Sequence, residues 1–172
     1  MQLKKKKSKY NIEPSSRIVN DDDLVDAIEY RVPWKGQAGL ASKFYPDEMI
    51  EQLSRNIIRV NPKYKGVYFT IEVDGDSMEP DYYAGDIVIG REIKRELWQY
   101  KLHYKDYDFI IAHGTKGIML KEITDHNVET GDIICHSLNN EHKDFILNLH
   151  EVSFLYNVVE HRTSGRTKRR NR

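Results

Sequence analysis

The feature that most constrains the fold of this chain is a series of short runs rich in β-branched and aromatic residues, separated by Gly and Asp. These runs lie at 67–73, 87–89, 107–113, 118–123, 133–136, 145–149 and 153–159. Such residues favour strands, and the intervening Gly and Asp favour tight turns. We therefore predict a mainly β, mostly antiparallel domain with one or two short helices.

The residues before these runs are expected to supply the helical structure. A proline and two acids at 46–48 are typical of a helix start, and four apolar residues follow at helical spacing: Met49, Ile50, Leu53 and Ile57. The acidic run 21–23 would cap a short helical turn through Leu24, Val25 and Ile28. Residues 31–34 are expected to be extended, because a proline restricts the residue before it.

The charges of the chain are segregated along its 172 residues. Residues 1–10 carry five Lys and no acid, and residues 162–172 carry six basic residues and no acid. Residues 11–161 keep 16 basic against 27 acidic side chains, a net charge of −11. We predict a flexible arm at 1–29, a folded domain at 30–160 and a disordered basic tail at 161–172. The acidic domain itself is not expected to grip DNA.

Cysteine content and hydropathy indicate the compartment. The chain has one cysteine, Cys135, which excludes an intramolecular disulfide and a zinc site built on cysteines, and which favours a reducing compartment. Its longest apolar runs are about four residues, far below the roughly 20 of a membrane helix. The Lys run 4–7 is not followed by the apolar stretch of a secretory signal. We expect a cytoplasmic protein with no membrane partner.

Ser77 is the first candidate for chemistry. It follows a strand and a Gly turn and precedes Pro80, so it lies on a tight connection where its hydroxyl can be exposed. From this pattern alone, an ordinary serine in a polar turn is the simpler interpretation. Glu79 stands where a G-x-S-x-G motif needs glycine, and none of the seven histidines occupies a recognisable triad setting.

Lys121 is the candidate base for a serine nucleophile. A lysine takes a proton only when it is neutral, and burial among apolar groups favours the neutral form. Lys121 shares a strand face with Met119 and Ile123, which predicts partial burial. A lysine on an edge strand whose stem covers apolar surface would have the same pattern. The pattern does not indicate that Lys121 meets Ser77.

Four segments resemble the LexA-like self-cleaving serine peptidases, which include LexA, the lambda-type phage repressors and the UmuD-type polymerase accessory proteins. VDGDSMEPDYYAGDIVIG resembles their nucleophile region, and DFIIAHGTKGIMLKEI resembles the strands that carry their lysine. GDIICHSLNN resembles a later strand that ends in Ser-x-Asn. VPWKGQAGLASKFY, residues 32–45, resembles their cleavage segment, which we place at residues 30–45. The resemblance covers residues 30–160 and implies the antiparallel β fold shared by LexA and the signal peptidases.

The resemblance implies a role for each matched residue. Lys121, 44 residues after Ser77, would be the general base, and Ser77 the nucleophile that attacks the Ala38-Gly39 bond. Backbone N–H groups of Ser77 and Met78 would stabilise the oxyanion. This mechanism needs no cofactor and no metal. The resemblance also implies a homodimer, and RecA assembled on single-stranded DNA as a possible partner that promotes cleavage.

The chain departs from the repressors of the family in one respect. They carry a helix-turn-helix domain before the peptidase domain, whereas only about 30 residues precede the cleavage segment here, too few for one. We expect a repressor effector domain that would reach DNA only through a missing helix-turn-helix domain, or a stand-alone UmuD-type polymerase accessory protein. A regulatory dimerisation module that does not cleave is a further alternative. A signal peptidase is disfavoured because those enzymes are usually membrane-anchored.

Overall fold

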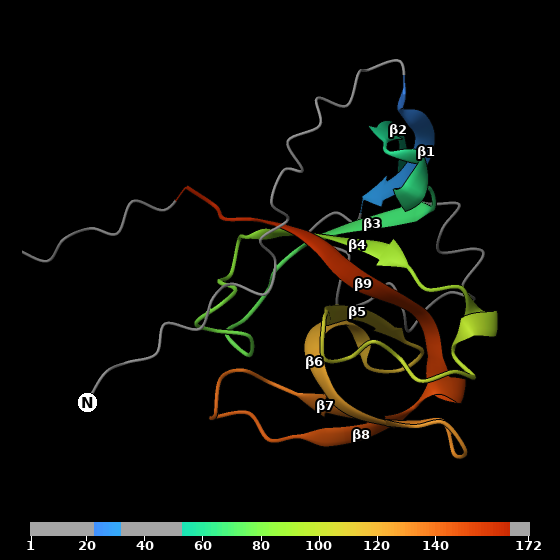
Figure 1. Cartoon of the computed structure of the whole chain (residues 1–172). Helices are drawn as coiled ribbons and strands as arrows, with labels where there is room; N and C mark the ends of the chain where they lie inside the picture. The colour runs from blue at the N-terminus through green and yellow to red at the C-terminus, as the bar shows by residue number, and fades with distance from the viewer. Residues whose placement is uncertain (1–22, 32–52, 166–172) are drawn as a thin grey trace, which may run out of the picture.

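A mainly β architecture organises the residues that the computed structural model describes, 23–31 and 53–165 (Figure 1). The strands are β1 (Val25–Arg31), β2 (Ser54–Val60), β3 (Val67–Glu72), β4 (Ile87–Glu92), β5 (Asp108–His113), β6 (Gly117–Asn127), β7 (Asp132–His136), β8 (Phe145–Asn148) and β9 (Val152–Arg162). Three single-turn 3-10 helices accompany them: η3 (Pro62–Tyr64), η4 (Arg95–Leu97) and η5 (Leu149–Glu151). The described ranges contain no α-helix.

The strands form one open sheet in the order β2-β1-β3-β4-β9-β5-β6-β7-β8. Neighbouring strands are antiparallel, except that β1 and β3 are parallel. The long strand β9 pairs with β4 along one half and with β5 along the other. Figure 1 shows β9 between β1–β4 and β5–β8, so this strand joins the two halves of the sheet.

Apolar clusters pack against the sheet, and two of them are large. The first core cluster contains Leu53, Phe69, Ile71, Val73, Met78, Tyr82, Val88, Ile110, Leu120, Tyr156 and Val158. The second core cluster contains Trp98, Leu102, Phe109, Ile111, Ile123, Ile133, Cys135, Leu147, Leu149, Val152 and Leu155. Strand alternation separates them, since the neighbours Phe109 and Ile110 belong to different clusters.

The predicted fold class is confirmed, and each of the seven predicted strand runs forms a strand. Within the described residues the predicted helix is wrong, because residues 54–57 belong to β2. The predicted helical turn through residues 24–28 is also wrong, because β1 begins at Val25. Ile57, taken as part of an apolar helix face, is 70% exposed. Pairing between β1 and β2 outweighs the local pattern. Residues 46–52 lie outside the described residues.

The sheet extends past both predicted domain boundaries. β1 begins at Val25, inside the predicted arm 1–29, and its Ala27 and Glu29 are buried. At the other end, β9 continues to Arg162, and the Ser164 N–H donates to Asp86 Oδ1 at 2.8 Å. Residues 161–165 therefore belong to the folded part and not to the predicted tail. The remaining parts of the arm and tail, 1–22 and 166–172, lie outside the described residues.

Within the described ranges, no helix has the length and apolar character that a membrane crossing requires.

Candidate active site

Ser77 lies on the connection between β3 and β4. Val73 and Asp86 close the base of this connection, with the Val73 N–H donating to the Asp86 carbonyl at 2.8 Å. Gly75 has a φ of +74°, a left-handed conformation that other residues rarely adopt. The Glu79 N–H then donates to the Asp76 carbonyl at 3.1 Å, which closes a β-turn. Ser77 and Met78 are the two central residues of this turn, called here the nucleophile turn (residues 76–79).

Packing and a buried hydrogen bond hold the residues that follow Ser77. Met78 is only 2% exposed and belongs to the first core cluster. Its carbonyl accepts from the Tyr82 N–H at 3.0 Å, and the Tyr82 hydroxyl donates to Asp108 Oδ2 at 2.8 Å. Asp108 begins β5, so the nucleophile turn is tied to the strand beside β6.

Lys121 projects from the middle of β6 and meets Ser77. It lies opposite Phe109 on β5 and is 8% exposed. Its Nζ lies 2.6 Å from Ser77 Oγ, within hydrogen-bond distance. When the amine is neutral, this contact lets the Ser77 hydroxyl donate to the Lys121 nitrogen. The structure thus brings together the two side chains that the resemblance assigned to catalysis, although 44 residues separate them in the chain.

The surroundings of Lys121 favour its neutral form. Burial lowers the pKa of Lys121 below its ordinary value, whereas Cys135 and the Asp76 carboxylate act in the opposite direction. Cys135 is fully buried, and burial raises the pKa of its thiol to about 12. The thiol is therefore neutral near pH 7, and Asp76 is the charge that most opposes a neutral Lys121.

A loop after β7 also reaches the nucleophile turn, and the sequence interpretation did not assign it a role. The Asn139 N–H donates to the Ser77 carbonyl at 3.1 Å, and Asn139 Nδ2 donates to the Asp76 carbonyl at 3.2 Å. His142 Nε2 lies 2.8 Å from Asp76 Oδ1. Asn139 is the Asn of the Ser-x-Asn segment, a signal that could have identified it; no sequence signal distinguishes His142.

The predicted scissile pair Ala38-Gly39 lies outside the described residues. The residues that flank segment 32–52 are described, however, and both ends contact the first core cluster, which also contains Met78. Tyr30 packs against the first core cluster, and Leu53 is a buried member of it. Met78 and Leu120, the neighbours of Ser77 and Lys121 in sequence, belong to the same cluster.

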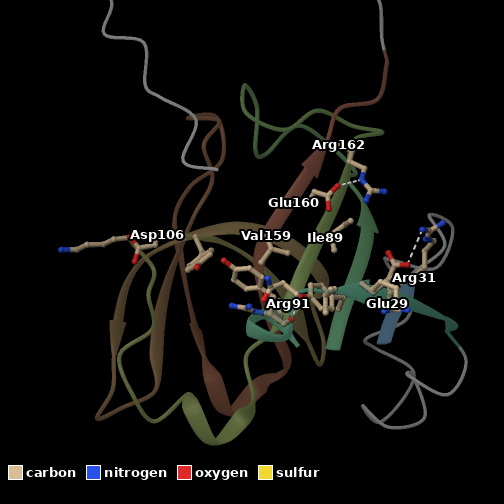
Figure 2. A pocket seen from close by; sticks show the side chains of 16 residues that line it. Glu29, Arg31, Ile89, Arg91, Asp106, Val159, Glu160 and Arg162 are labelled. Atoms are coloured by element: carbon tan, nitrogen blue, oxygen red, sulfur yellow. Dashed lines mark hydrogen bonds and ion pairs between the residues drawn. The ribbon is translucent and has the colours of Figure 1, made fainter. Parts of the chain in front are cut away.

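A groove of about 790 Å³ lies elsewhere on the sheet, and neither Ser77 nor Lys121 lines it. Figure 2 shows side chains from several strands around it, including Glu29, Arg91 and Arg162. Two ion pairs within it, Glu29 with Arg31 and Glu160 with Arg162, already neutralise much of its charge. We do not assign the catalytic centre to this groove, because neither Ser77 nor Lys121 lines it. The described residues include no group of three or more His, Cys, Asp or Glu side chains placed to hold a metal ion.

The sequence profile described as Peptidase S24-like matches residues 34–159, which is more than half of the chain. The match includes Ser77, Lys121 and the positions of Ala38 and Gly39. A search of curated proteins found no match.

Proposed function

The chain belongs to the Peptidase S24-like family, and we propose that it is a serine endopeptidase that cuts its own Ala38-Gly39 bond with a Ser77–Lys121 dyad. The observation that carries this proposal is the 2.6 Å contact between Lys121 Nζ and Ser77 Oγ. A surface lysine would be charged and unable to accept a proton, but Lys121 is buried and its pKa is lowered.

The reaction divides into acylation and hydrolysis. Neutral Lys121 takes the proton of the Ser77 hydroxyl while Oγ attacks the Ala38 carbonyl carbon. The tetrahedral intermediate expels the Gly39 nitrogen, which receives that proton from Lys121, and the Ala38 acyl group stays on Ser77. Water then attacks the ester, Lys121 again accepts the proton and returns it to Ser77, and the new carboxyl end leaves at Ala38.

The nucleophile turn offers donors for the oxyanion. Its closing bond joins the Glu79 N–H to the Asp76 carbonyl and does not use the N–H groups of Ser77 and Met78. Fixed backbone donors of this kind stabilise the negative charge of a tetrahedral intermediate. We assign the oxyanion site to these two amides because the same turn that presents Oγ also orients them.

The tether of the proposed substrate supports an intramolecular cut. The seven residue steps from Arg31 to Ala38 span at most roughly 25 Å when the chain is fully extended. Both flanks of segment 32–52 contact the core cluster that also holds Met78 and Leu120. The small residues Ala38 and Gly39 would let the backbone approach Ser77 closely. A tethered bond reacts at a high effective concentration, so docking of the segment would control the rate.

The proposed biological role is that of a switch. Cleavage would inactivate a transcriptional repressor in a DNA-damage or phage-type response, with the chain acting as a homodimer and RecA filaments promoting docking. The net charge of −11 over residues 11–161 supports DNA contact through a separate helix-turn-helix domain. The competing roles are a polymerase accessory protein and a dimerisation module that does not cleave.

Incubation of the full chain at alkaline pH, with and without RecA filaments, tests this function. Mass spectrometry should find fragments of 38 and 134 residues, and both should be absent from Ser77→Ala and Lys121→Ala. An intact chain under all conditions would contradict self-cleavage. A cut at another bond that the same two variants prevent would retain the dyad and reject the Ala38-Gly39 assignment.

A further inference from the structure

We infer that Asn139 and His142 are positioning residues that hold the nucleophile turn against the strand carrying Lys121. This inference rests on the proposed function, because it concerns how Ser77 Oγ is kept within reach of its base. The two residues lie on the positioning loop, defined here as residues 137–142, which directly follows β7. Neither residue touches the reacting atoms.

The positioning loop forms hydrogen bonds to the backbone carbonyls of Asp76 and Ser77. Asn139 uses its backbone N–H for the Ser77 carbonyl at 3.1 Å and its side-chain amide for the Asp76 carbonyl at 3.2 Å. His142 adds a contact of 2.8 Å to the Asp76 carboxylate. The two Asn139 contacts hold two successive peptide units, and the His142 contact holds the Asp76 side chain. With these peptide units held, rotation about the Ser77 Cα–Cβ bond is the motion that remains to direct Oγ toward Lys121.

The base of the positioning loop is anchored to the same hairpin as Lys121. β7 pairs with β6, with His136 opposite Glu122, and the loop begins at the next residue. Ser137 is buried, and Leu138 packs against the first core cluster. The side-chain Oδ1 of Asn139 also accepts from the Glu141 N–H at 3.0 Å, and its backbone carbonyl accepts from the His142 N–H at 3.1 Å. Nucleophile and base are therefore both positioned relative to the β6–β7 hairpin.

The His142 contact also restrains a charge. Asp76 is exposed on the nucleophile turn, and its carboxylate favours the charged form of Lys121. We expect the His142 ring, which lies 2.8 Å from this carboxylate, to restrict its approach to the amine. The loop thereby acts on both members of the dyad: it fixes the geometry of Ser77, and it limits the electrostatic effect of Asp76 on Lys121.

The test compares four variants of the full chain: His142→Ala, Asn139→Ala, His142→Gln and His136→Ala. His142→Gln keeps an N–H donor for Asp76. His136→Ala is the matched control, because it removes a His–Asp contact of 2.6 Å to Asp144 on the β7–β8 connection but keeps the backbone pairing of β7 with β6. Self-cleavage rates and deuterium exchange of peptides covering residues 74–80 are measured for each variant.

His142→Ala and Asn139→Ala should each slow cleavage by about 10- to 100-fold and speed exchange at residues 74–80, because a small displacement of the nucleophile lowers the rate steeply. His142→Gln should restore most of the rate, and His136→Ala should match the unmodified chain. Unchanged rate and exchange in both alanine variants would overturn the inference, as would an equal loss in His136→Ala. If the unmodified chain does not cleave, the proposed function fails, and exchange at residues 74–80 still decides whether the loop holds the turn.

Discussion

At the scale of single residues, Lys121 is held where its charge is unfavourable. A surface lysine stays protonated near neutral pH, whereas the Lys121 side chain is buried between apolar neighbours on β5 and β6. Burial lowers its pKa, and the Asp76 carboxylate partly offsets that effect. The balance between burial and the Asp76 charge sets the fraction of Lys121 that is neutral. It should therefore affect both the cleavage rate and the free energy of unfolding.

The pH dependence of self-cleavage reports this balance. The rate should rise with pH as Lys121 loses its proton, with a midpoint below the ordinary lysine pKa of about 10.4. Asp76→Asn removes a charge that favours protonated Lys121, so it should move the midpoint to lower pH. Rates measured between about pH 6 and 11 check this. A midpoint at the ordinary lysine value, or an upward shift in the variant, would contradict the assigned base.

Replacing Lys121 with methionine should stabilise the fold while abolishing cleavage. Between the lowered folded pKa and the ordinary unfolded pKa, the unfolded chain binds more protons, so stability rises with pH across that window. Below the window the folded chain holds a buried cation. Lys121→Met removes this penalty and should raise the free energy of unfolding at pH 7 by about 1 kcal/mol.

Urea unfolding at pH 7 and near pH 10 measures this effect. The gain in stability from Lys121→Met should shrink at the higher pH. There Lys121 of the unmodified chain loses its proton in the folded state, so its burial costs less free energy. Lys116→Met, at an exposed lysine in the turn between β5 and β6, is the control and should change stability by less than about 0.5 kcal/mol. A loss of stability in Lys121→Met would mean that the lysine is held by favourable interactions.

At the scale of elements, the pairing of β4 with β9 depends on a glycine. The register between these strands shifts between Ile89 and Gly90. A Cβ at Gly90 would lie 2.7 Å from Tyr156 Cβ and 3.0 Å from Ile110 Cδ1. Tyr156 stacks on Phe69 with ring centroids 4.7 Å apart, so the crowded atoms belong to the centre of the first core cluster. The close approach of β9 therefore requires a residue without a side chain.

Gly90→Ala should lower the free energy of unfolding by about 1–3 kcal/mol, the usual range for overpacking a core. Gly66→Ala is the matched control, because a Cβ there would meet only Arg91 side-chain atoms, at 3.6 Å or more. That change should stay within about 0.5 kcal/mol of the unmodified chain. Equal stability of the two variants in urea unfolding would show that β9 can move away from Gly90.

At the scale of the whole molecule, one thiol reports the opening of the fold. Cys135 is the single cysteine of the chain and lies fully buried in the second core cluster. Its pKa of about 12 leaves almost no thiolate in the folded state. Iodoacetamide near pH 8 should therefore leave the native chain unmodified and alkylate it in urea. Rapid labelling under native conditions, detected by mass spectrometry, would show that the β6–β7 region opens locally.

The charge segregation predicts where any contact with DNA arises. Replacement by Gln of the basic residues within 1–10 and 166–172 of the full chain should abolish salt-dependent binding to duplex DNA. The control replaces five exposed lysines of the folded part, which should leave binding unchanged: Lys63, Lys65, Lys94, Lys116 and Lys143. Binding that persists after neutralisation of the two terminal segments would contradict the expectation that residues 11–161 bind DNA poorly.

The strands of the sheet that carry a clear pattern could be predicted from the sequence. The runs that became β3 to β9 are rich in β-branched or aromatic residues, and Gly or Asp borders most of them, so local preference and burial agree. β2 could not be predicted, because its outer position leaves Ile57 exposed and gives the strand no apolar alternation. Its conformation depends on hydrogen bonds to β1, which lies more than 20 residues earlier in the sequence.

The sequence by itself determined the mainly β class, a serine on a turn that follows Gly75 and a lysine among apolar strand residues. Only the tertiary structure decided that these two side chains meet, that β1 and β2 frame segment 32–52, and that Asn139 and His142 grip the nucleophile turn. The physical reason is the range of the interactions. Strand preference and turn chemistry act over a few neighbouring residues, whereas a contact across 44 residues is set by strand order and register in the whole sheet.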